Sequence, residues 1–174
     1  YRWRRQILTN FETEQYDILT GFNGPFGISI HHNNLYISDI WDRKIIKFTA
    51  NLKFDAWLGF SFSEGKMGWY EDAESEDPKL PEESTLGILR GPHSIAFWNK
   101  KTYVADYFGG TVNVFDEDGN FIHYLETADV EAFFKGPANI YIDPNGTFYV
   151  SDWIGNQIFI FENIHIISFE SIFY

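Results

Sequence analysis

The sequence predicts an all-β protein built from repeated four-stranded units, and three observations predict it. One pattern occurs three times, within residues 24–48, 91–115 and 136–161. In each copy, β-branched and aromatic residues alternate with polar ones, which favours strands over helices. Residues typical of tight turns separate these runs, at Asn33-Asn34, Asp118-Gly119 and Asp143-Pro144-Asn145-Gly146.

The copies share both residue types and spacing. Each begins with Gly-Pro, continues through an Ile and a short turn, and reaches a Tyr-Ile/Val-Ser/Ala-Asp run. An Ile or Val follows the Asp after six residues, and a Phe follows it after nine. Pro92 and Pro137 are 45 residues apart, whereas Pro25 and Pro92 are 67 apart, so an insertion separates the first two copies. Repetition at this period indicates an array of supersecondary units.

Each copy predicts four strands, called a to d in chain order. Strand a follows the Gly-Pro pair, strand b ends at the residue before the shared Asp, and strand c ends at the shared Phe. Strand d is weaker and is expected at 53–58, 121–125 and 165–169. Four antiparallel strands in a unit of roughly 40–45 residues form the blade of a β-propeller.

The chain divides into segments of one domain, residues 1–174. The expected segments are a half blade at 1–20, a blade at 24–59, an acidic insertion at 60–89, a blade at 90–127 and a blade at 136–169. The insertion holds eight acids against two lysines, which is half of the net charge of −12. Pro78 and Pro81 interrupt any helix there, so we expect a long acidic loop.

The repeated run, Gly-Pro-x-x-Ile followed by Tyr-Ile/Val-Ser/Ala-Asp and Ile/Val-x-x-Phe, resembles the NHL repeat. Members of this family are β-propellers, often with six blades, so the resemblance implies an NHL-type β-propeller. It covers three full copies and part of a fourth. Closed propellers have about 4–8 blades, and about three and a half are present here. Missing sequence or a second chain would complete the ring, and we expect self-association through the blade ends.

Composition limits the partners. The chain is acidic, with a pI near 4.7, and phosphate contacts dominate nucleic-acid affinity, so no nucleic-acid partner is expected. No apolar run is long enough to span a bilayer, and no membrane partner is expected. The absence of cysteine excludes disulfides and thiolate catalysis, and it leaves the cellular compartment undetermined.

The candidate binding face is the one that carries the d-to-a and b-to-c loops, because strand directions alternate within a blade. Aromatic residues and the d-to-a insertion gather there, as on a ligand-binding surface. The same aromatic residues would also serve packing between blades. Asn139 would either orient a ligand or bond to the backbone. The ligand-binding candidates are Trp41, His93, Tyr107, Phe108, Asn139 and Trp153.

The three shared aspartates, Asp39, Asp106 and Asp152, are interpreted as structural residues that accept backbone N–H bonds in the b-to-c turns. His93 starts strand a in one copy only, where the other copies have Phe26 and Ala138, so no metal site is assigned. No nucleophile-base pair or phosphate-binding loop is present, and no catalytic residue is assigned.

The sequence therefore favours a non-catalytic recognition or scaffold module that binds a protein, peptide or glycan, with no cofactor. The alternative is an enzyme similar to the lyases and lactonases built on six-bladed propellers. That resemblance implies a divalent metal in the central channel, held partly by blades that this sequence lacks.

Overall fold

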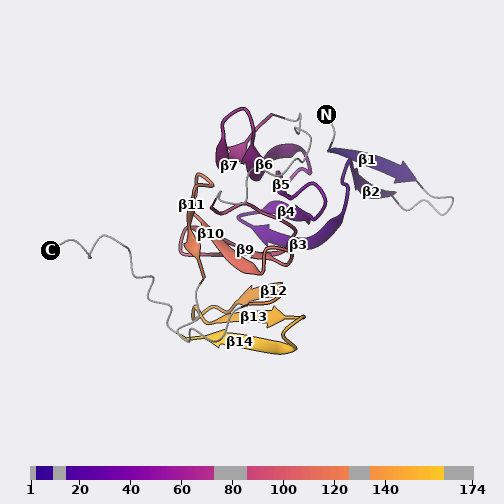
Figure 1. The fold of residues 1–174 in the computed structure, drawn as a ribbon. Coiled ribbons are helices and arrows are strands. Elements are labelled where there is room, and N and C mark those ends of the chain that lie inside the picture. The colour runs from indigo at the N-terminus through magenta and orange to yellow at the C-terminus, as the bar shows by residue number, and fades with distance from the viewer. Residues whose placement is uncertain (1–2, 10–14, 73–85, 126–133, 163–174) are drawn as a thin grey trace.

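The computed structural model describes residues 3–9, 15–72, 86–125 and 134–162 (Figure 1). Every regular element in these ranges is a strand, which confirms the all-β prediction. The strands are β1 (Arg4–Thr9), β2 (Gln15–Thr20), β3 (Pro25–His31), β4 (Asn34–Asp39), β5 (Lys44–Phe48), β6 (Phe54–Ser61), β7 (Lys66–Tyr70), β8 (Pro92–Trp98), β9 (Lys101–Asp106), β10 (Thr111–Phe115), β11 (Phe121–Tyr124), β12 (Pro137–Ile142), β13 (Phe148–Asp152) and β14 (Gln157–Phe161).

Three antiparallel sheets correspond to the three copies of the repeat. Their strand orders are β3-β4-β5-β6-β7, β8-β9-β10-β11 and β12-β13-β14. In Figure 1 the sheets follow one another from the top of the view to the bottom. Consecutive inner strands are in contact, β3 with β8 and β8 with β12. This arrangement is a partial β-propeller, as the sequence predicted.

The core lies between the blades. One buried cluster joins the first two sheets and contains Tyr36, Ile45 and Ile95. A second cluster joins the second and third sheets and contains Tyr103 and Ile140. Because successive side chains of a strand point to opposite faces, each blade presents one apolar face to the blade before it and another to the blade after it.

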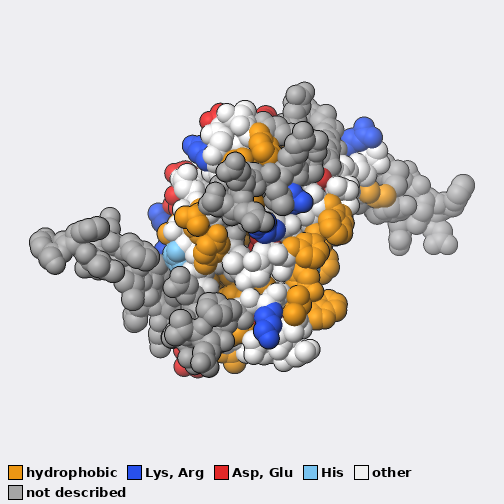
Figure 2. Space-filling model, viewed as in Figure 1, with side chains coloured by type: hydrophobic (Ala, Val, Ile, Leu, Met, Phe, Trp, Pro, Cys, Tyr) orange, Lys and Arg blue, Asp and Glu red, His pale blue; other side chains and the backbone are white. Residues whose placement is uncertain are grey.

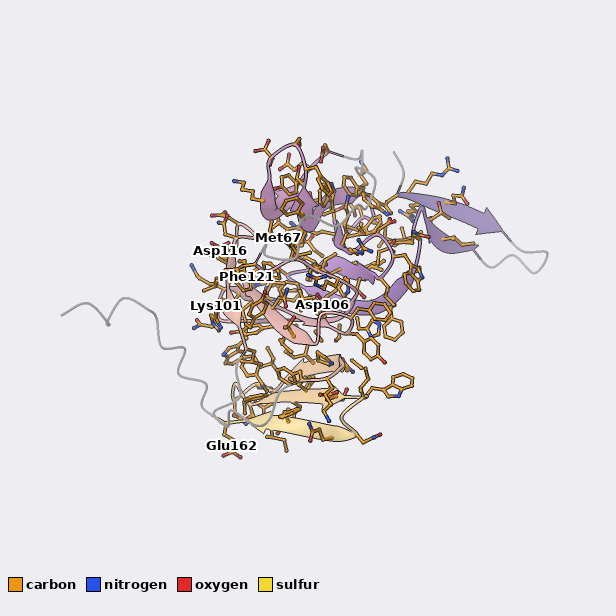
Figure 3. All side chains as sticks on the ribbon, viewed as in Figure 1. Met67, Lys101, Asp106, Asp116, Phe121 and Glu162 are labelled. Carbon is orange, nitrogen blue, oxygen red and sulfur yellow. The ribbon has the colours of Figure 1, made fainter. Side chains whose placement is uncertain are left out.

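The insertion differs from the sequence expectation. A loop was expected throughout 60–89, but residues 66–70 form β7, which pairs with β6. Met67 is buried in the cluster between the first two blades, with Phe121 packed against the same cluster (Figure 3). The acidic residues drew the interpretation toward a loop, whereas the short run Lys66–Tyr70 carries apolar side chains that this cluster buries. The remainder of the insertion, 73–85, lies outside the described residues.

The first segment forms a separate two-stranded sheet of β1 and β2, which extends away from the blades in Figure 1. Trp3 anchors it, because this side chain is buried and its ring stacks on Phe54 with 5.2 Å between centroids. Strand d of the last blade, expected at 165–169, lies outside the described residues.

Candidate functional site

Each shared aspartate fastens the loop between strands b and c to the segment that precedes strand a. The carboxylate of Asp106 accepts N–H bonds from Arg90 at 2.7 Å, Gly91 at 2.7 Å and Gly109 at 3.3 Å. Figure 3 shows Asp106 at the end of β9 where this loop begins. The same three bonds recur at Asp39, from Asn23, Gly24 and Asp42, and at Asp152, from Lys135, Gly136 and Gly155.

A backbone bond reinforces each of these attachments. The N–H of Tyr107 donates to the carbonyl of Gly91 at 3.0 Å, and Ile40 and Trp153 make the matching bonds to Gly24 and Gly136. Sequence reasoning expected donors within the b-to-c turn and missed the two that precede strand a. The signal was available, because a Gly-Pro pair stands at a nearly constant distance before each Asp.

Burial disfavours the charged form of Asp106, the aspartate of the middle blade. It raises the pKa of Asp106 to about 6, while the N–H donors of Arg90, Gly91 and Gly109 act in the opposite direction. The carboxyl group of Asp106 is fully buried, and the three hydrogen bonds given above all come from backbone N–H groups of loops. Its geometry is therefore that of a loop anchor.

The glycine before each proline makes room for a loop side chain. A Cβ on Gly24 would overlap the Trp41 ring, and one on Gly91 would overlap the Phe108 ring. Trp41 and Phe108 both stand two residues after the shared Asp, so the glycine and the loop aromatic form one unit. The Gly-Pro motif thereby fixes where these rings lie on the surface.

The loop side chains form a continuous exposed surface, which we call the aromatic rim. The rings of Trp41 and Phe108 are 5.8 Å apart, and those of Tyr107 and Trp153 are 6.5 Å apart. Figure 2 shows hydrophobic side chains gathered along the right-hand edge, where the b-to-c loops lie. The rim is defined by five side chains that are each more than half exposed: Phe26 at the start of β3, and Trp41, Phe108, Trp153 and Ile154 in the b-to-c loops.

His93 lies beneath the rim. Its ring is stacked between Phe26, at 4.2 Å, and Tyr107, at 4.4 Å between centroids. Only 6% of the residue is exposed, and burial lowers the pKa of its imidazole, so the ring is neutral at pH 7. The structure thus places His93 and Tyr107 in the support of the rim rather than on its outer surface.

Asn139 joins two inner strands. Its Oδ1 accepts a 2.6 Å hydrogen bond from Ser94 Oγ, which also accepts the N–H of Ile140. Of the six candidates, Trp41, Tyr107, Phe108, Trp153 and His93 come together through ring contacts. Asn139 has a linking role between β8 and β12.

The described residues do not supply a metal-ligand set. Within them no group of three or more His, Cys, Asp or Glu side chains is close enough to hold an ion. The start of strand a, where the enzyme alternative would place ligands, has Phe26, His93 and Ala138.

Among the residues that the structure describes, no helix is long and apolar enough to cross a membrane.

Comparisons with known proteins identify the fold. No family model and no curated protein sequence matches the chain. Similar solved structures include hydrazine synthase of Kuenenia stuttgartiensis, with 19% identity over 83% of this chain and 34% of that one, and a TM-score of 0.52. A luciferin-regenerating enzyme has 12% identity over 87% and 44%, with a TM-score of 0.51. An auxiliary nutrient binding protein of Bacteroides thetaiotaomicron has 13% identity over 90% and 43%, with a TM-score of 0.50.

This chain therefore spans less than half the length of the three structures named above. The likeness supports a propeller fold. The three similar structures include proteins named as enzymes and one named as a binding protein, so the comparison does not distinguish between these two classes of function.

Proposed function

We propose that this chain is an NHL-type propeller module that recognises a protein, peptide or glycan through the aromatic rim, without catalysis. The observation that carries the proposal is the repeated exposure of Trp41, Phe108 and Trp153 or its neighbour Ile154 in three successive b-to-c loops. Isolated exposed apolar residues are ordinary, but a contiguous set on one face is typical of an interaction surface.

The anchoring of the loops also supports recognition. Each loop is tied by one buried carboxylate and one backbone bond, so its ring is held in place before a ligand arrives. A surface that is already ordered loses little conformational entropy on binding. The broad faces of Trp41 and Trp153 suit sugar rings and the apolar side chains of a peptide.

Binding measurements on rim variants test the proposal. Glycan and peptide arrays would supply a ligand, and calorimetry would then compare wild type with Trp41→Ala and Trp153→Ala. We expect each variant to lose about tenfold or more in affinity, since truncating a buried aromatic anchor costs about 2 kcal/mol or more. The melting temperature should stay the same, because both rings are largely exposed.

Trp98→Ala is the matched control. Trp98 ends β8 at the a-to-b turn, which lies on the face of the propeller opposite the b-to-c loops. Its substitution should therefore leave ligand binding unchanged. Equal binding by the wild type and both rim variants would contradict the proposal. Metal-dependent turnover of a lactone or an amidated peptide by the purified chain would replace it with the enzyme alternative.

A further inference from the structure

A cavity of about 410 Å³ lies between the first two blades, on the face opposite the aromatic rim. The a-to-b turns of both blades line it, with His31 and His32 from the first blade and Lys100 and Lys101 from the second. Figure 3 shows Lys101 at the left of the view, whereas the aromatic rim follows the right-hand edge of Figure 2. Ligand pockets commonly enclose about 300–1,000 Å³, so this cavity has room for a small molecule.

One difference within the repeat explains why this interface is hollow. Phe148, four residues before the shared Asp of the last blade, is 1% exposed and packs edge-on against the ring of Tyr103, with 4.8 Å between centroids. Thr102 has the same repeat position in the middle blade, and it lines the cavity together with Tyr36 of the first blade. Because threonine is much smaller than phenylalanine, less of the space between the blades is filled at the first interface than at the second.

The lining of the cavity is basic, although the chain is acidic. Lys47, Lys100 and Lys101 line it with one acid, Glu117, in a chain whose net charge is −12. Lys47 is held by Asp55 at 2.6 Å. Lys100 and Glu117 are 3.7 Å apart with side chains that are 80% and 66% exposed. An exposed pair of this kind contributes little, so the ammonium group of Lys100 is available to an anion.

The backbone at Lys100 favours glycine or asparagine over lysine. Its φ is 60°, in the left-handed region that most side chains disfavour. The residue at the same repeat position, six before the shared Asp, is Asn33 in the first blade and Gly146 in the last, both with positive φ. Residues in such conformations cost stability and cluster at binding sites. What Lys100 adds at this position is a positive charge beside the cavity.

Aromatic rings form the rest of the wall. Phe97 stacks on His31, with 4.4 Å between centroids and 7° between planes, and its ring is 4.5 Å from that of Tyr36. Trp69, on the additional strand β7, closes the set at 5.9 Å from Tyr36. Burial, and to a smaller extent the neighbouring His32, lowers the pKa of His31, so its ring is neutral at pH 7. Such a wall offers a stacking surface to a planar ring.

We propose that this cavity binds a small phosphomonoester that carries a planar ring, of the class of nucleoside monophosphates. The lysines outnumber the acid in the lining by two, which matches the charge of about −1.5 to −2 on a phosphate group at pH 7. Lysine binds phosphate as a point charge, and the aromatic wall receives the ring. The site lies on the other face of the propeller from the aromatic rim, so it stands apart from the proposed function.

Calorimetric titration of the whole chain with three probes tests the proposal. Adenosine 5′-monophosphate has both the charge and the ring, adenosine lacks the charge, and inorganic phosphate lacks the ring. We expect saturable binding of the monophosphate. Adenosine and inorganic phosphate should each bind at least tenfold more weakly at the same ionic strength.

Two substitutions locate the site. Thr102→Phe introduces the side chain that fills the matching position in the last blade, so it should abolish binding of the monophosphate. Lys100→Gly removes one charge at a position that favours glycine, so it should weaken binding at least threefold while the melting temperature stays the same or rises. Circular dichroism checks the fold of both variants, and Lys100→Gly keeps the test decisive if Thr102→Phe fails to fold.

A matched pair of double variants separates local from overall charge. Lys100→Ala/Lys101→Ala removes two charges from the lining and should weaken binding of the monophosphate at least tenfold. Lys66→Ala/Lys135→Ala removes two charges from exposed lysines outside the lining and should bind like wild type.

Three outcomes would overturn the proposal. The first is the absence of saturable binding at millimolar adenosine 5′-monophosphate. The second is equal affinity for the monophosphate and for either adenosine or inorganic phosphate, because the charge or the ring would then be irrelevant. The third is equal weakening by the two double variants, which would indicate attraction to the overall charge and not to this cavity.

Discussion

The inner blade interfaces and the outer face of the last blade use the same repeat positions with opposite results. The residue six positions after the shared Asp is fully buried at Ile45 and Val112, but 67% exposed at Ile158. On the same face as Ile158, Tyr141 and Ile160 are also exposed.

This difference separates two kinds of information. The repeat encodes which side chains point to each face of a blade, because alternation along a strand is local. Burial requires a second sheet about 10 Å away, and the outer face of the last blade has no such sheet among the described residues. The aspartate attachments recur in all three blades, so each loop is held by its own blade and not by the neighbour.

The largest expected effect is a matched pair of isoleucine truncations. Ile45→Ala should lower the free energy of unfolding by about 2–5 kcal/mol, because it leaves a cavity in a packed interface. Ile158→Ala should change it by about 0.5 kcal/mol or less, since the side chain is already in water. Urea denaturation measures both. Similar losses for the two variants would mean that the last face is covered in solution.

The aspartate anchors come next. Asp106→Ala should cost about 1–3 kcal/mol, because three loop N–H groups lose their acceptor. Asp152→Ala should cost a similar amount, since its bonds are the same and lie within the last blade. Thermal and urea unfolding give both values. Loss of ligand binding at an unchanged melting temperature would instead make the aspartate a binding residue.

A serine pair probes the polar part of the interface. Ser38 Oγ accepts the N–H of Gly27 and donates to the carbonyl of His93 at 2.9 Å, so it links two blades. Ser38→Ala should therefore cost about 1 kcal/mol. Ser151 has the same place in the last blade and shares the outward face of Ile158, so Ser151→Ala should be close to neutral. A larger loss at Ser151 than at Ser38 would contradict the comparison.

The smallest effect is a pH dependence. The pKa of Asp106 rises from an ordinary value of 3.8 to about 6 in the folded protein, so the folded state binds more protons between these values. Stability from this group is therefore present at low pH and lost as the pH rises through 6. Lowering the pH from 7 to 5.5 should therefore raise the free energy of unfolding through Asp106, by up to about 1 kcal/mol. The difference between wild type and Asp106→Asn in urea unfolding isolates this contribution, and an equal response of the two proteins would refute it.

Much of the fold was predictable, since alternation, turn residues and spacing are local properties. They placed the a, b and c strands of all three blades, and they placed the loop aromatics on one face. β7 was missed because Lys66–Tyr70 is short and gains its stability from pairing with β6 and from the burial of Met67. Neither contribution can be read from the segment alone.

The sequence by itself determined the four-strand unit, the two faces of each blade and the position of the shared aspartates, because each depends on residues close together in the chain. The tertiary structure decided which distant residues contact one another and which side chains are buried. It showed that Arg90 and Gly91 donate to Asp106, that His93 is enclosed while Trp153 is exposed, and that Ile28 is bare where Ile95 is buried. These outcomes depend on which surfaces meet, and contacts between distant segments have no local signature in the sequence.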